Sequence, residues 1–472
     1  MTKMLRGIVM AFAGALFLLA ATTEAAPPPP PGSLRQPPLG PAEQRQIQLG
    51  RLGITPCVAP TGVGTAHNSI SATSPPTERT WTEAGSPHVL QYDINISVPV
   101  TVESCAVVRI GVGKTITISP GGAFIAAGQR ERPVTIEPLF AGMAWSQIRA
   151  LGGDLSLTKS TVRGGGAGTP VAYMGALRLQ SGSLHVDDVE IADSRSQGVY
   201  INNNTIGFDA ASQNLRVHGS VGFPVNVCAN AIGSIPSGQY IGNGHDAIGI
   251  GISGGCGSVV NSQTMHNRGV PYHVGLGADS GRLDIDSKTN GAIAVLTIEP
   301  GVNILFPPGG MLSVAGRNMT NGLALGALIA NGNGAPIIFT SDQGPASAPG
   351  NWLGIRFGNP VAPSSFINNA KVMFAGGADI TGSSSCPYPV PPNPASLSVA
   401  HDAAIRIFGE PPGQFITNTE IVASARFGID RGWQGNALTD FQSNTFTAVA
   451  LCKQTLPSPP PGSSCPTNPP CP

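Results

Sequence analysis

Short runs in which apolar and polar residues alternate follow one another along most of this chain. Residues 106–128 read AVVRIGVGKTITISPGGAFIAAG, and residues 294–316 read AVLTIEPGVNILFPPGGMLSVAG. Alternation with a period of two, bounded by glycine, proline, asparagine and serine, is the pattern of short β-strands joined by turns. Hardly any stretch after the first residues has the period of a helix. The pattern therefore predicts an all-β protein.

The two passages belong to an internal repeat. A repeated, strand-patterned, glycine-rich unit is typical of a solenoid, in which each coil buries its inner face on its neighbours. We predict a β-solenoid built from two duplicated units, residues 80–262 and 263–453, stacked into one continuous body; two separate domains are the alternative. Insertions in the second unit, such as residues 317–334, are expected in loops. Corresponding positions include Gly85 and Gly269, Trp145 and Trp352, Arg149 and Arg356, Arg178 and Arg406, and Glu190 and Glu420.

Three segments carry a resemblance to a known class of protein. They are Pro336-Ile-Ile-Phe-Thr-Ser followed by Gly350-Asn-Trp-Leu-Gly-Ile-Arg, the segment Gly222-Phe-Pro-Val-Asn-Val, and the segment that begins Gly242-Asn-Gly-His. Together they resemble exported bacterial proteins of the right-handed parallel β-helix (pectin-lyase-like) class, over most of residues 80–453. The resemblance implies a right-handed parallel β-helix. It implies little about activity, because many proteins of this kind have no assigned reaction.

The ends of the chain have a different composition. Lys3 and Arg6 precede a 14-residue apolar stretch, residues 8–21, which has the pattern of an export signal cleaved after Ala25. A membrane anchor is the alternative, although a spanning helix needs about 18 or more apolar residues. The predicted segments are a signal peptide (1–25), a proline-rich spacer with an N-terminal cap region (26–79) and a proline-rich tail that contains cysteines (454–472).

Composition narrows the possible partners. Charged residues make up 11% of the chain, but hydrophobic residues reach 41%, so the chain has the apolar content of a folded protein rather than a disordered one. The 26 basic residues balance 26 acidic residues. A protein that binds nucleic acid or an anionic membrane normally carries a basic excess. We therefore expect no nucleic-acid partner. Because no stretch after the signal is long and apolar enough to span a bilayer, we also expect no membrane span once the signal is removed.

The chain contains eight cysteines, all after the predicted signal. An even number in an exported protein favours disulfides, and no Cys-x-x-Cys pair of a zinc or redox site is present. The connectivity cannot be deduced from sequence alone. Pairing of nearest neighbours predicts disulfides between Cys57 and Cys105 and between Cys228 and Cys256.

Candidate catalytic groups are few. Glycosidases need two or three convergent carboxylates, and polygalacturonases carry Asn-Thr-Asp, Asp-Asp, Gly-His-Gly and Arg-Ile-Lys patterns. This chain has only Asp187-Asp188, which the second unit replaces by Thr417-Asn418. The only dense acidic cluster runs from Asp187 to Asp193, and it lacks the spacing of a calcium-binding loop. We expect turn-capping aspartates there, with a calcium site as the alternative, and we predict no metal site and no cofactor.

A row of outward-facing residues recurs in both units. In Trp352-Leu-Gly-Ile-Arg356-Phe, strand alternation would turn Leu353 and Ile355 to the core, so that Trp352 and Arg356 share the solvent face. Aromatic faces and charged hydrogen-bonding groups suit sugar rings. An Arg–Glu ladder on exposed sheet, with tryptophan covering an edge, is the alternative. The predicted binding residues are Trp145, Arg149, Arg178, Glu190, Trp352, Arg356, Arg406 and Glu420.

These observations predict a function class rather than a reaction. We expect a secreted or cell-surface structural or interaction protein, with a polysaccharide or another cell-surface component as its partner and without catalysis. The low charge and the missing catalytic patterns motivate this expectation. The alternative is a polysaccharide lyase or glycoside hydrolase that acts on acidic glycans through the cluster near Asp187 to Asp193.

Overall fold

The computed structural model describes residues 55–168, 174–275, 281–288, 292–314, 324–378, 402–435, 437–459 and 470–472. The chain divides between Thr55 and Pro56, and every element below belongs to the part from Pro56 onward. The predicted signal peptide and the first part of the predicted spacer lie outside the described residues. Two of the cysteines, Cys386 and Cys465, also lie outside them.

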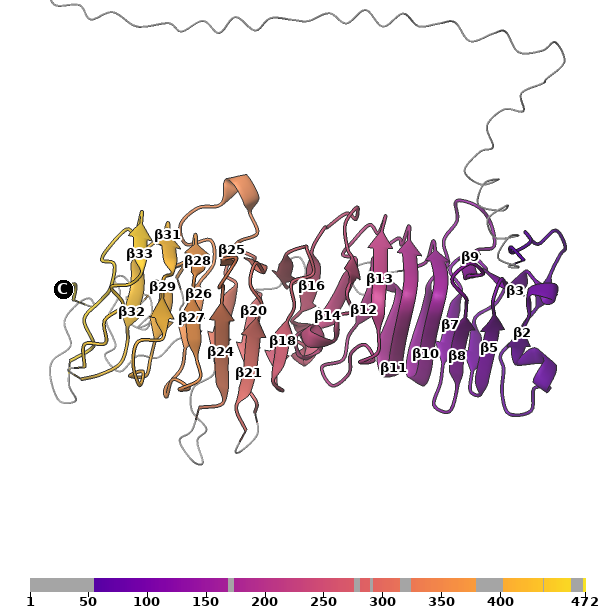
Figure 1. Ribbon diagram of the computed structural model, residues 1–472, viewed down its shortest axis with the longest axis horizontal. Helices are drawn as coiled ribbons and strands as arrows, with labels where there is room; N and C mark the ends of the chain where they lie inside the picture. The colour runs from indigo at the N-terminus through magenta and orange to yellow at the C-terminus, as the bar shows by residue number, and fades with distance from the viewer. Residues whose placement is uncertain are drawn as a thin grey trace, which may run out of the picture. The chain divides into compact units, whose positions relative to one another are not determined.

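Strands from successive coils lie side by side and pair in parallel (Figure 1). Ile94 pairs with Ile116, Ile116 with Ile148, and Ile148 with Leu177. Each of these residues belongs to the coil after the one before it, so the chain advances by one strand with every coil. The fold is all-β with long parallel sheets, and it fits a parallel β-helix.

Each coil of the N-terminal half presents three faces. The first face begins with β4 (Ile94–Ile96) and β7 (Thr115–Ile118), the second with β2 (Thr80–Trp81), β5 (Pro99–Glu103) and β8 (Ala123–Ala127), and the third with β1 (Thr65–Ala66), β3 (His88–Leu90), β6 (Val107–Ile110) and β9 (Val134–Pro138). The long strand β10 (Gln147–Arg163) runs through all three faces, because it pairs in turn with β7, β8 and β9. The next long strand, β11 (Gly175–Ala192), pairs with β10 over the same three segments. The third face continues in β13 (Gln213–His218) and β15 (Gly238–Gln239).

The first face continues through the described chain to its C-terminal end. Its later strands are β12 (Gln197–Ile201), β14 (Val225–Cys228), β16 (Ile248–Gly251), β19 (Tyr272–Val274), β22 (Asn303–Phe306), β25 (Ile337–Ser341), β28 (Ala370–Met373), β31 (Glu420–Val422) and β33 (Thr445–Thr447).

Two further sheets complete the coils of the C-terminal half. The six-stranded sheet contains β17 (Ser258–Val259), β20 (Arg282–Ile285), β23 (Met311–Val314), β26 (Gly354–Phe357), β29 (Ala403–Ile407) and β32 (Phe427–Arg431). The five-stranded sheet contains β18 (Gln263–Met265), β21 (Ala294–Ile298), β24 (Gly326–Asn331), β27 (Phe366–Asn368) and β30 (Ile416–Thr417). Short 3-10 helices lie at η1 (Pro76–Glu78), η2 (Glu83–Gly85), η4 (Ala229–Ser234), η5 (Ser253–Gly255) and η6 (Gly344–Ala346).

The core consists of aliphatic columns that run from coil to coil. Strand alternation turns every second residue inward, as the burial of β7 and β22 shows. Each fully buried Val, Leu or Ile side chain contributes about 1.5–3 kcal/mol relative to exposure, so the columns are the main source of stability. One column on the first face joins Ile96, Ile118, Ala150, Leu179, Ile201, Val227, Ile250 and Val274, all fully buried.

The internal sequence repeat does not coincide with the coils throughout. Residues 147–150 pair with β7 on the first face, whereas the corresponding residues 354–357 form β26, which pairs with β23 in the six-stranded sheet. The difference arises in the inserted residues 317–334. We expected a loop there, but residues 326–331 form β24. This extra strand adds one side to the coil and moves the following segment to the next face.

Disulfides lie at both ends and in the middle of the described chain. Cys57 is bonded to Cys105, and Cys228 to Cys256, which are the two pairings that nearest-neighbour reasoning predicts. A third bond joins Cys452 to Cys471 in the predicted tail. The disulfides are consistent with an oxidising, extracellular location.

Candidate functional site

A row of charged side chains lies on the outer surface of the third face. Val108, Ile136 and Val162 are buried in adjacent strands, so alternation turns the residues that follow them outward. Arg109 pairs in register with Glu137, and Arg109 Nε lies 2.9 Å from Glu137 Oε1. The exposed Arg163 extends the row in the next coil. Three successive coils therefore each contribute one charged group.

A groove of about 790 Å³ lies along this row. Besides the three residues of the row, its charged lining includes Asp193 and Arg195, both exposed. Arg195 Nη2 donates to the carbonyl of Gly142 at 3.3 Å. The rest of the lining is mostly apolar, with Pro138, Leu139, Met143 and Val221 among its members. The groove thus combines hydrogen-bonding cations and anions with apolar surface.

A second cavity, of about 450 Å³, lies at the corner before the third face. Lys159, Thr161, Asp188 and Glu190 line it together with Arg130. Its lining is polar, in contrast to that of the groove, and it includes part of the acidic cluster noted in the sequence.

The predicted binding residue Glu190 is held ionised in this second cavity. His218 Nε2 lies 2.8 Å from Glu190 Oε1. This hydrogen bond, reinforced by the charges of His218, Arg163 and Arg216 against the effect of partial burial, lowers the pKa of Glu190 below its usual range. A glycosidase acid is instead a carboxyl group whose pKa is raised, so that it is protonated when the substrate binds. Glu190 does not fit that role.

The acidic residues from Asp187 to Asp193 have different partners and line different cavities. Asp187 forms an ion pair with Lys159 at 3.3 Å and accepts a hydrogen bond from Gln213 at 3.0 Å. Asp188 and Asp193 both have left-handed backbone angles, with φ of 53° and 58°, as expected of aspartates at turns. Asp188 lines the smaller cavity and Asp193 the groove. The acids therefore do not converge on one point.

The structure brings the predicted binding arginines together in two separate pairs. Arg149 and Arg178 are register partners on the first face, where burial and the Arg149 charge lower the pKa of Arg178 against the opposing effect of Tyr200. Arg356 and Arg406 are partners in the six-stranded sheet. Both lie over the ring of Phe408, each 4.3 Å from its centroid.

The second pair is less accessible than the first. Arg406 is 4% exposed, and its Nε lies 3.8 Å from the fully buried Asp430 carboxylate. Glu420 forms an ion pair with Lys371 at 2.7 Å on the first face. Since the predicted residues lie on three different sides of the coils, they do not form one site, and their role in binding stays a prediction.

The predicted outward orientation is wrong for both tryptophans. Trp145 and Trp352 are fully buried. Trp145 Nε1 donates to the carbonyl of Arg163, and Trp352 Nε1 to that of Met373, each at 2.7 Å. Both tryptophans precede the first residue of their strand by two positions. Strand alternation therefore does not govern them, and the turn directs the indole inward.

Sequence reasoning missed most of the groove residues. Arg109, Glu137 and Arg163 each follow a buried β-branched residue within a strand. Because only 11% of the residues in this chain are charged, charged residues at outward positions of neighbouring strands could have indicated this groove. Arg195 and Val221 lie in turns, and no strand pattern could have placed them beside the row.

The described residues hold no metal cluster and no membrane-spanning helix. Within them, no group of three or more His, Cys, Asp or Glu residues is arranged to hold a metal ion. No helix in the described part of the chain is long and apolar enough to cross a membrane. No protein-family model, no curated protein and no solved structure matches this chain.

Proposed function

We propose that this protein is an exported, right-handed parallel β-helix of the pectin-lyase-like class, and that it binds a polysaccharide outside the cell without catalysis. The groove on the third face supports the proposal, because it collects charged side chains from successive coils. The disulfides and the long parallel sheets are consistent with such a protein. It would act as a structural or interaction protein at or beyond the cell surface.

The chemistry of the groove favours an acidic polysaccharide. Three arginines line it, against two acids. The guanidinium fork binds carboxylates with two parallel hydrogen bonds, and the apolar side chains can contact the carbon-bound faces of sugar rings. Arg109 is partly neutralised by Glu137. Arg163 and Arg195 are exposed and are therefore the residues expected to contact an anionic ligand.

The test is a comparison of charge-removing variants on immobilised glycans. We expect the double variant Arg163→Gln/Arg195→Gln to lose at least about tenfold in affinity, since a hydrogen bond to a charged group contributes about 1.5–3 kcal/mol. Arg282→Gln, which removes an exposed arginine from the six-stranded sheet, is the matched control and should bind normally. Equal binding by the double variant and the control would refute the groove as the binding site.

One observation favours the alternative of a polysaccharide lyase or hydrolase. The smaller cavity places Lys159 and Arg130 beside Asp188 and Glu190, so basic and acidic groups share one site. The ionised state of Glu190 and the division of the acids support binding over catalysis. Release of unsaturated or reducing sugars from acidic glycans, lost on Asp188→Ala, would establish the enzyme in place of the binding protein.

A further inference from the structure

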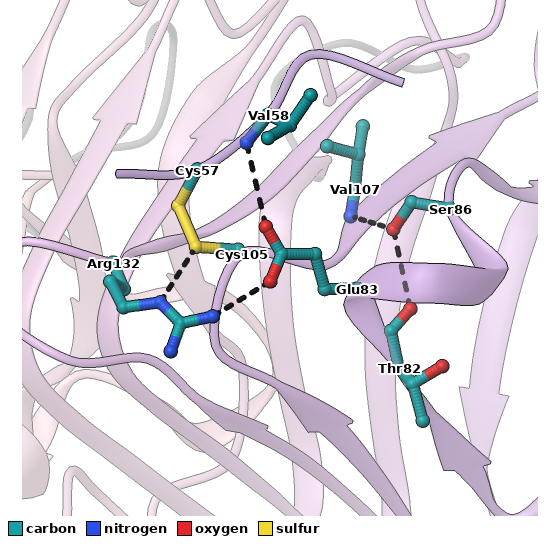
Figure 2. Close-up of a disulfide and its surroundings, with 8 residues drawn as sticks. All are labelled: Cys57, Val58, Thr82, Glu83, Ser86, Cys105, Val107 and Arg132. Atoms are coloured by element: carbon teal, nitrogen blue, oxygen red, sulfur yellow. Dashed lines mark hydrogen bonds and ion pairs between the residues drawn. A yellow bond between two sulfur atoms is a disulfide. The ribbon is translucent and has the colours of Figure 1, made fainter. Parts of the chain in front are cut away.

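The disulfide between Cys57 and Cys105 joins two sulfur atoms in unlike surroundings (Figure 2). Cys57 is exposed, whereas Cys105 is 2% exposed. In thiol–disulfide exchange, a thiolate attacks one sulfur and the other sulfur leaves. Because Cys57 is the exposed partner and Cys105 is almost fully buried, the structure favours attack at Cys57 and makes Cys105 the leaving group.

Space for an incoming thiol is present beside the bond. A cavity of about 440 Å³ is lined by both cysteines and by Val58, Ala59 and Pro60. The lining also includes Arg109 and Glu137 of the charged row on the third face. A cysteine side chain on a peptide is small enough to enter such a cavity.

The guanidinium group of Arg132 lies where it can stabilise the leaving sulfur. Arg132 Nε donates to Cys105 Sγ at 3.2 Å, and Arg132 Nη2 donates to Glu83 Oε2 at 2.7 Å (Figure 2). The other oxygen of Glu83 accepts a hydrogen bond from Val58 N at 3.4 Å. A neutral disulfide sulfur is a weak acceptor. A thiolate in the same place would be a charged partner of Arg132, so the contact strengthens as the bond breaks.

The other two disulfides among the described residues lack this combination. Cys228 and Cys256 are both buried, at 0% and 8% exposure, so an external thiol reaches neither. Cys471 is exposed. In the described part of the chain, however, Arg132 is the side chain that directs an N–H at a disulfide sulfur within hydrogen-bonding distance.

We propose that the Cys57–Cys105 disulfide is a covalent attachment site for a cysteine thiol of a peptide partner. The partner's thiolate attacks Cys57 Sγ, a new S–S bond forms, and the Cys57–Cys105 bond breaks. The electron pair of the broken bond goes to Cys105 Sγ beside Arg132, and the proton of the incoming thiol goes to water. One disulfide is exchanged for another, so no oxidant or reductant is consumed.

The leaving sulfur stays in position for the reverse reaction. Cys105 N donates to the carbonyl of Pro133 at 3.2 Å, and Cys105 lies between β5 and β6 in the body of the coil. This backbone contact does not depend on the disulfide. Attack of the Cys105 thiolate on Cys57 would therefore release the partner and restore the original bond. The attachment is reversible.

The test uses the full native protein and reduced glutathione, a cysteine-containing peptide, as the probe. After an acid quench and alkylation, peptide mapping should find glutathione on Cys57 and a newly alkylated Cys105, with Cys228–Cys256 intact. Arg132→Gln should slow the attachment about tenfold, because it removes the cation beside the leaving thiolate. Arg282→Gln, with the same change of charge on a distant strand, should react at the original rate.

A second pair of variants keeps the test independent of how well Arg132→Gln folds. In Cys57→Ser, Cys105 is a free thiol, and its ultraviolet thiolate absorbance should appear at lower pH than in Cys57→Ser/Arg132→Lys, where the Nε donor is lost but the charge is kept; the same pH dependence in both variants would overturn the role of Arg132. The proposal is overturned if glutathione attaches to Cys105 instead of Cys57. It is equally overturned if attachment requires denaturant, or if Arg132→Gln reacts as fast as the native protein.

Discussion

Acidification should loosen the N-terminal coil through two buried histidines. His67 and His88 are 7% and 3% exposed, and His67 stacks on the ring of Trp81 with 4.5 Å between centroids. His88 Nε2 lies 2.8 Å from the carbonyl of Thr82 and must donate to it. His88 Nδ1 then accepts from His67 Nε2, 2.8 Å away. This arrangement is complete with both imidazoles neutral.

Burial and the neighbouring His88 lower the pKa of His67 from 6.5 to about 4. Burial also lowers the pKa of His88, against the raising effect of its bond to the Thr82 carbonyl. Between pH 6.5 and about pH 4, the unfolded chain therefore binds protons that the folded coil does not. Stability is complete above pH 6.5 and falls with pH through this window, by roughly 3 kcal/mol for His67 at about 1.4 kcal/mol per pH unit.

Native-state amide exchange in β1 and β3, corrected for the intrinsic pH dependence of exchange, measures this loss of stability in the N-terminal coil. The opening equilibrium should rise about a hundredfold from pH 7 to pH 4. In His67→Gln, an amide N–H can still reach His88 Nδ1 but does not titrate, so most of the pH dependence should disappear. If His67→Gln shows the same pH dependence as the native protein, the histidine explanation is refuted.

Three further predictions concern the core, the short strand β15 and the acidic cluster. Ile118→Ala, in the buried column, should lower the free energy of unfolding in urea by about 2–5 kcal/mol, whereas the outward Thr117→Ala should change it by less than about 1 kcal/mol. Gly238→Ala would place its Cβ 1.8 Å from the carbonyl oxygen of Leu215, so amide exchange in β15 should rise; Gly62→Ala, whose nearest neighbour would be 3.9 Å away, should have no such effect. His218→Gln should raise the pKa of Glu190 in a carboxyl NMR titration, and an unchanged pKa would show that the hydrogen bond is not its cause.

Strand alternation was sufficient to predict the kind of fold. The period of two around Ile116 and Ile118 predicts inward-facing residues, and both are fully buried. The same reasoning failed at Trp145 and Trp352, because they lie in turns, where the backbone no longer alternates. A separate inference failed at residues 317–334. The growing offset between the two repeated units indicated an insertion there, which was expected to be a loop, but residues 326–331 form β24.

The candidate site was harder to predict because its residues are distant in sequence. Arg109, Glu137 and Arg163 become neighbours only through the length of each coil, and that length varies from turn to turn. No pattern in a single segment reveals which charges will be stacked. The disulfide between Cys57 and Cys105 was easier to predict than the groove, because pairing cysteines that are neighbours in the sequence needs no knowledge of the coil length.

The extra strand β24 has a consequence for any long ligand. It leaves the Arg149–Arg178 pair on the first face and the Arg356–Arg406 pair on the six-stranded sheet. A single polymer lying straight along one face can meet one pair but not the other. The repeated sequence therefore does not place its corresponding arginines along one path, and a ligand that contacts Arg149 and Arg178 on the first face does not continue to Arg356 in the six-stranded sheet.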